Sequence, residues 1–192
     1  TLARLIREVG PCRLAIAPRQ SPYQALLESI VYQQLTAKAA ATIYGRVCKS
    51  FGSSRCPGAE KVADAPDELL RAAGLSRSKV SAVKDLAQKS LDGEIPTRRA
   101  AEKLSDAALV ECLTNVRGVG TWTVEMFLIF TLGRPDVLPL DDYGVRKGFA
   151  RTFGRDVLPK PKELAALGEK WRPFRTAASW YLWRALDLDA KG

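Results

Sequence analysis

The chain has 192 residues, enough for a sizeable core in one domain or two packed lobes. Thirty basic residues against 21 acidic ones give a formal net charge of +9, which favours a polyanionic partner such as nucleic acid. The chain contains no histidine, which excludes Ser-His catalysis, Cys-His catalysis and any metal site with histidine ligands.

Apolar residues recur at helical spacing almost throughout the chain, and no segment alternates like a half-buried strand. In chain order, this spacing and the usual start and stop residues predict helices over residues 22–31, 36–51, 64–74, 76–91, 105–113, 121–132, 142–153, 161–168 and 173–186. With the N-terminal segment, we expect an all-α fold of about ten short helices. Chain order suggests one lobe over 24–132 and a second from 1–23 plus 133–192, with a ligand cleft between the lobes.

A glycine turn separates the helix that ends near residue 113 from the one that begins near residue 121. Gly118 and Gly120 flank one apolar residue, so the backbone can turn sharply and approach a ligand closely. The free N–H groups there could hold a DNA phosphate. The backbone carbonyls of Thr114, Val116 and Val119 could face one point and hold a monovalent cation such as Na⁺ or K⁺. An ordinary helix–turn–helix corner explains the same spacing equally well.

Two adjacent acids, Asp141 and Asp142, stand where another helix begins. An aspartate at this place is usually an N-cap. The helix dipole also favours its ionised form, and an ionised carboxylate can stabilise a cationic sugar or orient a water molecule. One residue can serve as both cap and catalyst.

Two further features have a structural and a functional interpretation. Trp122 follows the glycine turn directly, and Trp180, Tyr181 and Trp183 lie on the last helix; helical aromatics are more often core residues than ligand contacts. The sequence Gln33-Gln-Leu interrupts two helices and reads either as a plain loop or as a tip that enters a duplex beside a displaced base.

The cysteines and the longest apolar runs limit the cofactors and the location. The spacings between Cys12, Cys48, Cys56 and Cys112 match neither a zinc site nor an iron–sulfur site. We therefore expect reduced thiols in a cytoplasmic protein, or a nuclear one in a eukaryote. No apolar run reaches about 18 residues, so no membrane span is expected.

Four segments follow one another along the chain: Ser29-Ile-Val-Tyr-Gln-Gln-Leu-Thr, Val116-Arg-Gly-Val-Gly-Thr-Trp-Thr, Leu138-Pro-Leu-Asp-Asp-Tyr-Gly-Val-Arg-Lys, and Trp171-Arg-Pro-Phe-Arg with Tyr181-Leu-Trp. Taken together, they resemble the helix-hairpin-helix (HhH-GPD) superfamily of DNA glycosylases, specifically its 3-methyladenine DNA glycosylase II (AlkA-type) branch. The second segment is similar to the hairpin of that branch, with an arginine where proline is usual. The resemblance covers roughly residue 22 to the C-terminus.

The resemblance implies a role for each matching residue. In this branch the second acid of the pair is catalytic, which points to Asp142, although counting as in more distant members would suggest Asp141. Trp122 stands where bifunctional members carry a nucleophilic lysine, so no Schiff base is expected. The implied base pocket contains Trp122, Met126, Trp183 and Gln34. The implied DNA contacts are Leu35 as the wedge, Gly118, Gly120 and Thr123.

The implied function is monofunctional excision of alkylated bases such as 3-methyladenine from duplex DNA. The resemblance further implies a monomer that needs no cofactor, has no iron–sulfur cluster and lacks the N-terminal β-rich domain of the longest members. Two other classes compete with it. A non-catalytic DNA-damage-binding module would keep the hairpin without needing Asp142, and a basic helical scaffold would explain the charge but not the ordered motifs.

Overall fold

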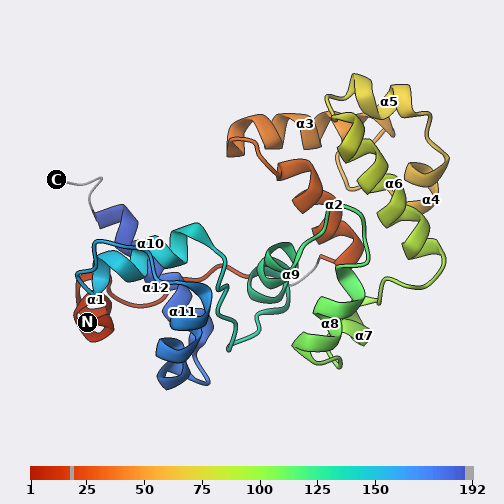
Figure 1. Cartoon of the computed structure of the whole chain (residues 1–192). Helices are drawn as coiled ribbons and strands as arrows, with labels where there is room; N and C mark the ends of the chain where they lie inside the picture. The colour runs from red at the N-terminus through yellow and green to blue at the C-terminus, as the bar shows by residue number, and fades with distance from the viewer. Residues whose placement is uncertain (18–19, 189–192) are drawn as a thin grey trace. The chain divides into compact units, whose positions relative to one another are not determined.

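The computed structural model describes residues 1–17 and 20–188, and every regular element in these ranges is helical (Figure 1). The expected all-α class is therefore confirmed. The chain divides into two compact units, Arg19–Phe127, here called the hairpin unit, and Thr1–Pro18 with Leu128–Gly192, here called the aspartate unit. The boundaries expected from the sequence, after residues 23 and 132, each lie a few residues later than the boundaries after Pro18 and Phe127. No helix in the described ranges is both long and apolar enough to cross a membrane.

The hairpin unit contains the first long run of predicted helices. Its helices are α2 (Pro22–Tyr32), α3 (Ala37–Ser50), α4 (Ala59–Asp64), α5 (Asp67–Ala72), α6 (Arg77–Leu91), α7 (Arg98–Ala101), α8 (Asp106–Leu113) and α9 (Thr121–Phe127). Side-chain oxygens of Ser21, Thr36, Ser76 and Ser105 accept backbone N–H groups at the starts of α2, α3, α6 and α8. The sequence did not predict α4 and α7, and it placed the start of α5 too early.

Helix α6 is central to the packing of the hairpin unit. It lies against α2, α4 and α5, while α9 packs on α2 and α8. The side chains that these contacts bury are almost all aliphatic, and each contributes about 1.5–3 kcal/mol by leaving water. They include Leu26, Ile30, Val62, Leu70, Val83, Leu86, Leu109, Leu113 and Val124.

The aspartate unit is built around one close helix crossing. Its helices are α1 (Leu2–Val9), α10 (Tyr143–Thr152), α11 (Pro161–Gly168) and α12 (Arg175–Asp187), with a short 3-10 turn at Glu169–Trp171. Helix α12 packs on both α10 and α1. A Cβ at Gly148 would lie 1.9 Å from the backbone carbonyl oxygen of Leu182, so only glycine permits this approach of α10 to α12. The crossing buries Val145, Phe149, Tyr181, Leu182 and Ala185.

The apolar segment expected as one helix over 121–132 is two segments of different geometry. After α9, residues Leu128–Leu132 form a π-helix. The carbonyl of Phe130 accepts the N–H of Ala17 at 2.7 Å, and the carbonyl of Leu128 accepts the N–H of Arg134 at 2.9 Å. The boundary between the two units falls where α9 ends and the π-helix begins.

Candidate functional site

The glycine turn of the hairpin unit is a compact corner between α8 and α9. The N–H of Val116 donates to the carbonyl of Leu113 at 3.2 Å, and the N–H of Val119 donates to that of Val116 at 3.0 Å. Gly118 has a φ of 75°, a left-handed conformation that favours glycine. Gly120 is exposed, and its carbonyl begins the hydrogen bonding of α9 by accepting from Val124 at 3.2 Å.

The carbonyls proposed for a monovalent cation belong to the same corner. Val116 already accepts one N–H, and a carbonyl oxygen has a second lone pair. The carbonyl of Gly118 accepts the side-chain amide of Gln33 at 2.9 Å. Backbone oxygens such as those of Thr114, Val116 and Val119 are suitable ligands for a hard cation. In the described ranges no three His, Cys, Asp or Glu side chains gather as an alternative site.

The wedge turn, defined here as Gln33–Leu35, lies between α2 and α3. Gln34 has a φ of 58°, the only positive value for a non-glycine residue in the described ranges. This conformation costs about 1–2 kcal/mol for such a residue and therefore indicates a constrained turn. The side chain of Leu35 is 39% exposed, and Thr36 then caps α3. The strained turn therefore presents an apolar side chain to solvent.

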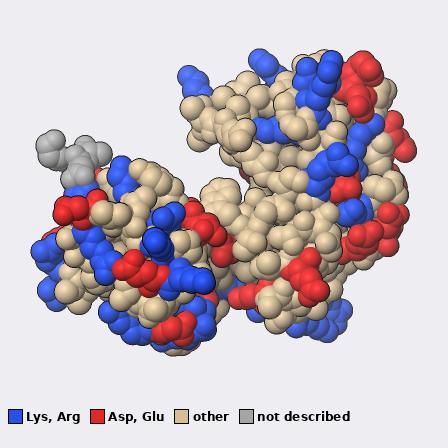
Figure 2. Space-filling model, viewed as in Figure 1, with Lys and Arg blue, Asp and Glu red and all other residues tan. Residues whose placement is uncertain are grey.

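The segment 116–123, which contains the glycine turn, is called the hairpin below. The wedge turn and the hairpin line one open pocket of about 560 Å³ within the hairpin unit. Every side chain that lines it is uncharged. Elsewhere lysine and arginine side chains are spread over the face seen in Figure 2, with acidic groups among them. The lining residues are Ser29, Tyr32, Gln33, Gln34, Leu35, Gly118, Trp122, Thr123 and Met126. Trp122 is 45% exposed, so part of its ring remains available to a ligand.

Six residues that the sequence singled out therefore line one pocket: Gln34, Leu35, Gly118, Trp122, Thr123 and Met126. Gly120 lies in the same corner but does not line the pocket. Trp183, which the resemblance assigned to the base pocket, belongs to the aspartate unit and contacts Asp142 there.

Asp142 is the N-cap of α10 and is only 9% exposed. Its Oδ1 accepts the backbone N–H of Val145 at 2.6 Å and the indole N–H of Trp183 at 2.8 Å. Asp141, in contrast, is exposed. Two donors on one carboxylate oxygen stabilise its charge and fix its orientation, which are the conditions for preorganised electrostatic stabilisation.

The indole of Trp183 is held by its neighbours. Its ring stacks on Phe130 of the π-helix Leu128–Leu132, with ring centroids 5.7 Å apart. On another side lies Gly144, where a Cβ would approach Trp183 Cδ1 to 2.8 Å and Asp142 Oδ1 to 3.1 Å. Gly144 thus leaves the room that the hydrogen bond between Trp183 and Asp142 requires.

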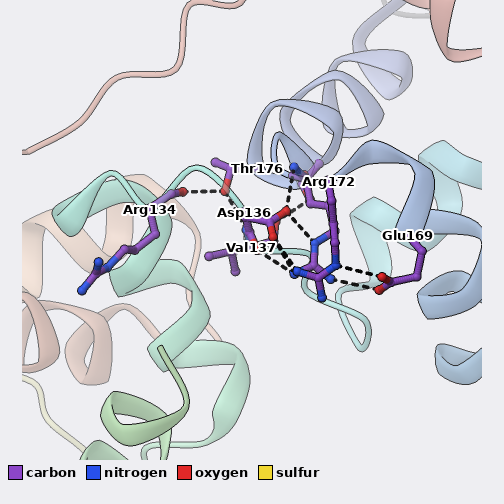
Figure 3. A network of polar contacts seen from close by, with 8 residues as sticks. Arg134, Asp136, Val137, Glu169, Arg172 and Thr176 are labelled. Atoms are coloured by element: carbon purple, nitrogen blue, oxygen red, sulfur yellow. Dashed lines mark hydrogen bonds and ion pairs between the residues drawn. The ribbon is translucent and has the colours of Figure 1, made fainter. Parts of the chain in front are cut away.

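A polar network fixes the segment that leads to Asp142 (Figure 3). The guanidinium of Arg175 donates to both carboxylate oxygens of Asp136, at 2.7 and 3.0 Å, and Arg172 adds a further bond at 2.7 Å. The hydroxyl of Thr176 donates to the carbonyl of Arg134 at 2.6 Å and accepts the N–H of Val137 at 3.0 Å. The hydrogen bonds from Arg175 lower the pKa of Asp136, so its carboxylate remains charged.

Sequence reasoning missed the residues that support these sites from a distance. The amide of Gln33, the glycine at 144 and the carboxylate of Asp136 have no local pattern that marks their roles. The segment Trp171-Arg-Pro-Phe-Arg was recognised as part of the resemblance, but its acidic partner lies far away in the sequence. Only the tertiary structure brings Asp136 to Arg172 and Arg175.

Comparisons with known proteins agree with this architecture. DNA-3-methyladenine glycosylase 1 of Schizosaccharomyces pombe is 38% identical over 186 residues, covering 96% of this chain and 82% of that protein. The solved structure of the S. pombe 3-methyladenine DNA glycosylase in complex with abasic DNA matches with a TM-score of 0.86 and 39% identity, over 95% of this chain and 89% of that one. A Bacillus halodurans DNA-3-methyladenine glycosidase structure matches with a TM-score of 0.88 and 35% identity, over 99% and 86% of the chains.

A family model matches as well, over residues 27–173, a range that includes the wedge turn, the hairpin and Asp142. On this evidence the chain belongs to the HhH-GPD superfamily of base excision DNA repair proteins.

Proposed function

We propose that this protein is a monofunctional DNA glycosylase that hydrolyses the glycosidic bond of alkylated bases, such as 3-methyladenine, in duplex DNA. The observation that carries the proposal is the carboxylate of Asp142, buried and held by two N–H donors in a chain whose relatives are DNA-3-methyladenine glycosylases. The chain offers no histidine for proton transfer. A base that is already cationic needs none, because it leaves as a neutral molecule.

The hairpin unit supplies the contacts with damaged DNA. The N–H groups around Gly118 and Gly120 hold a backbone phosphate, and Leu35 enters the duplex beside the lesion. Displacing a base costs a few kcal/mol, and less at a damaged pair. The exposed ring of Trp122 favours a cationic purine by about 0.5–2 kcal/mol, and Met126, Thr123 and Gln34 complete the pocket.

The aspartate unit supplies the negative charge for the chemical step. As the bond from C1′ to the base breaks, its electron pair leaves with the base and positive charge develops on the sugar. The carboxylate of Asp142 stabilises this charge. The oxygen of a water molecule then bonds to C1′, and its proton passes to Asp142 or to solvent. Trp183 and the N–H of Val145 keep the carboxylate oriented throughout.

The reaction ends at an abasic site because the pocket provides no amine nucleophile. Trp122 stands where lyase members of the superfamily carry lysine, so the sugar cannot form a Schiff base there. We propose further that the protein acts as a monomer without an iron–sulfur cluster. A Na⁺ or K⁺ ion held by the carbonyls of Thr114, Val116 and Val119 would place positive charge next to the bound phosphate.

The substitution Asp142→Asn tests the catalytic assignment. Asparagine also caps helices, so α10 should remain intact while the charge is lost. Base release from a duplex with a single 3-methyladenine should fall by at least about a thousand-fold, and duplex affinity should change little. Asp141→Asn is the matched control and should keep near-normal activity. Normal turnover by Asp142→Asn would refute the assignment, and tight binding without excision by the wild type would identify a non-catalytic damage-binding module.

A separate assay tests the absence of lyase activity. The product strand should remain intact until alkali is added, and borohydride should trap no covalent adduct. Strand cleavage by the enzyme alone together with a trapped adduct would show that another amine takes the place expected of lysine.

A further inference from the structure

One lysine attaches the strained wedge turn to helix α6 of the hairpin unit. Lys79 of α6 directs its ammonium group to the carbonyls of Val31 and Gln33, each at 2.7 Å. These carbonyls lie at the C-terminal end of α2, where the last backbone acceptors lack partners within the helix. A cation there also interacts favourably with the helix dipole.

The wedge turn is also attached to the hairpin directly. The side-chain amide of Gln33 donates to the carbonyl of Gly118 at 2.9 Å. The same residue therefore gives its backbone carbonyl to Lys79 and its side chain to the glycine turn. Hydrogen bonds thus join the wedge turn directly to the hairpin, although the two segments are far apart in the sequence.

Helix α6 holds the hairpin as well as the wedge turn. The carboxylate of Asp85 accepts the backbone N–H of Arg117 at 2.7 Å and is paired with Lys89 at 3.2 Å. Between these two attachments, a Cβ at Gly118 would lie 3.5 Å from the Cβ of Ala82. Lys79, Ala82 and Asp85 follow one another at intervals of three residues, so successive members are neighbours on the helix surface.

From this stripe we infer that Lys79 is a positioning residue for base displacement: α6 fixes the wedge turn against the hairpin, so that a phosphate held by the hairpin brings Leu35 into the duplex. The inference rests on the proposed function. If the wedge turn could move independently, the free energy of the phosphate contact would not offset the cost of unstacking the lesion.

The environment of Lys79 supports a specific role for its charge. Partial burial lowers the pKa of the Lys79 ammonium, because the charged form has lost part of its hydration. Its two carbonyl partners replace that lost water. Lys84, on the same helix, instead pairs with Asp67 of α5 at 2.8 Å and offers a control with the same charge.

The test compares Lys79→Met with Lys84→Met, since both remove one positive charge from α6. Displacement is measured by the fluorescence of 2-aminopurine beside the lesion, in an Asp142→Asn background that prevents excision. Lys79→Met should lower the displaced fraction, and in the active enzyme it should slow single-turnover excision about ten-fold, the effect of losing hydrogen bonds to a charged group. Lys84→Met should stay within about two-fold of the wild type for excision.

Four further comparisons separate a positioning role from a merely structural one. A lesion in a single-nucleotide bulge has no partner base to lose, so Lys79→Met should excise it at close to the wild-type rate. Combined with Leu35→Ala, Lys79→Met should cost little more, because both changes remove the same step. Gln33→Ala, which leaves the helices intact, should show a smaller defect in the same direction, and Lys79→Arg should restore most of the activity.

Equal behaviour of the two lysine variants would overturn the inference, as would an equal defect on paired and bulged lesions or additive effects with Leu35→Ala. If the wild type excises no lesion, the proposed function fails instead. The fluorescence measurement still reports on Lys79 in that case, because it requires no chemistry.

Discussion

Leu35 and Trp122 of the hairpin unit are 39% and 45% exposed, whereas Asp142 of the aspartate unit is 9% exposed. The first two line an open pocket without charged side chains. Asp142 accepts two N–H donors, one of them from an indole that is itself held by Phe130 and Gly144. The hairpin unit thus offers exposed uncharged surface, whereas the aspartate unit offers a buried carboxylate with a fixed orientation.

Under the proposed function, the difference follows from the task of each region. A surface that replaces stacked bases must offer apolar area that remains exposed until DNA arrives, and its free energy is gained on binding. A carboxylate that stabilises a transient cation must already be oriented, since reorganisation during the reaction would add to the barrier. Changes in the hairpin unit should therefore alter base displacement, binding and selectivity, and changes around Asp142 should alter the rate of the chemical step.

The largest expected effect concerns the packing that holds the aspartate unit together. Gly148→Ala would place a methyl group 1.9 Å from the carbonyl oxygen of Leu182, so α10 and α12 must separate. The free energy of unfolding should fall by about 3 kcal/mol or more, as measured by urea denaturation. Gly45→Ala is the control in α3 of the hairpin unit, where a Cβ meets nothing within 4 Å, and it should be neutral or stabilising. Equal stability of the two variants would contradict the close crossing.

A second effect should appear in the rate alone. Trp183→Phe keeps an aromatic ring on Phe130 but removes the N–H that Asp142 accepts. Excision should slow by about ten- to a hundred-fold, the range for a hydrogen bond to a charged group, with unchanged affinity for an abasic duplex. The factor should be equal for 3-methyladenine and 7-methylguanine. Trp180→Phe, on the same helix, should leave the rate unchanged, and a Trp183→Phe defect that differs between the two bases would indicate direct contact with the base.

A third effect should appear in selectivity. Trp122→Ala removes the exposed ring that lines the pocket of the hairpin unit. Preference for a cationic purine over neutral hypoxanthine should fall by about two- to thirty-fold, which corresponds to one cation–π contact. Trp122→Phe should retain most of the preference. An unchanged preference in the alanine variant, measured as the ratio of kcat/KM values, would show that the ring does not contact the base.

The smallest effect concerns acid stability of the aspartate unit. The pKa of Asp136 is lowered by Arg175, so its contribution to stability is present above its ordinary value of about 3.9 and is lost as the pH falls through the lowered value. Asp136→Asn should reduce Tm slightly at pH 7 and should show a shallower loss of Tm below about pH 4 than the wild type. Asp156→Asn, at an exposed position, is the control. Parallel Tm profiles for the wild type and Asp136→Asn would contradict this role.

Much of the fold could be predicted from local signals. Serine, threonine and aspartate at helix starts, and proline or glycine near helix ends, identified most of the longer helices. The short helices α4 and α7 contain too few turns to show a period. The π-helix at Leu128–Leu132 was not anticipated, because its apolar residues show the same helical spacing as those of α9.

The grouping of the candidate residues was predictable where they are close in sequence. The wedge turn and the hairpin each carry their candidate residues within a few positions, and the fold brings the two segments to one pocket. The roles of Lys79, Gly144 and Asp136 could be recognised only in the structure. Lysine, glycine and aspartate are common residues, and no neighbouring residue marks these three positions. The contact of Trp183 with Asp142 likewise became visible only in three dimensions.

The stripe on α6 has a consequence for how such a protein can change over generations. Lys79 holds two backbone carbonyls and Asp85 a backbone N–H, so these attachments do not depend on which side chains the wedge turn and the hairpin carry. The residues at the tips can then vary with the preferred lesion while the scaffold beneath them stays constant. Under the proposed function, single substitutions in the pocket could then change the preferred substrate while Lys79 and Asp85 continue to hold the wedge turn and the hairpin.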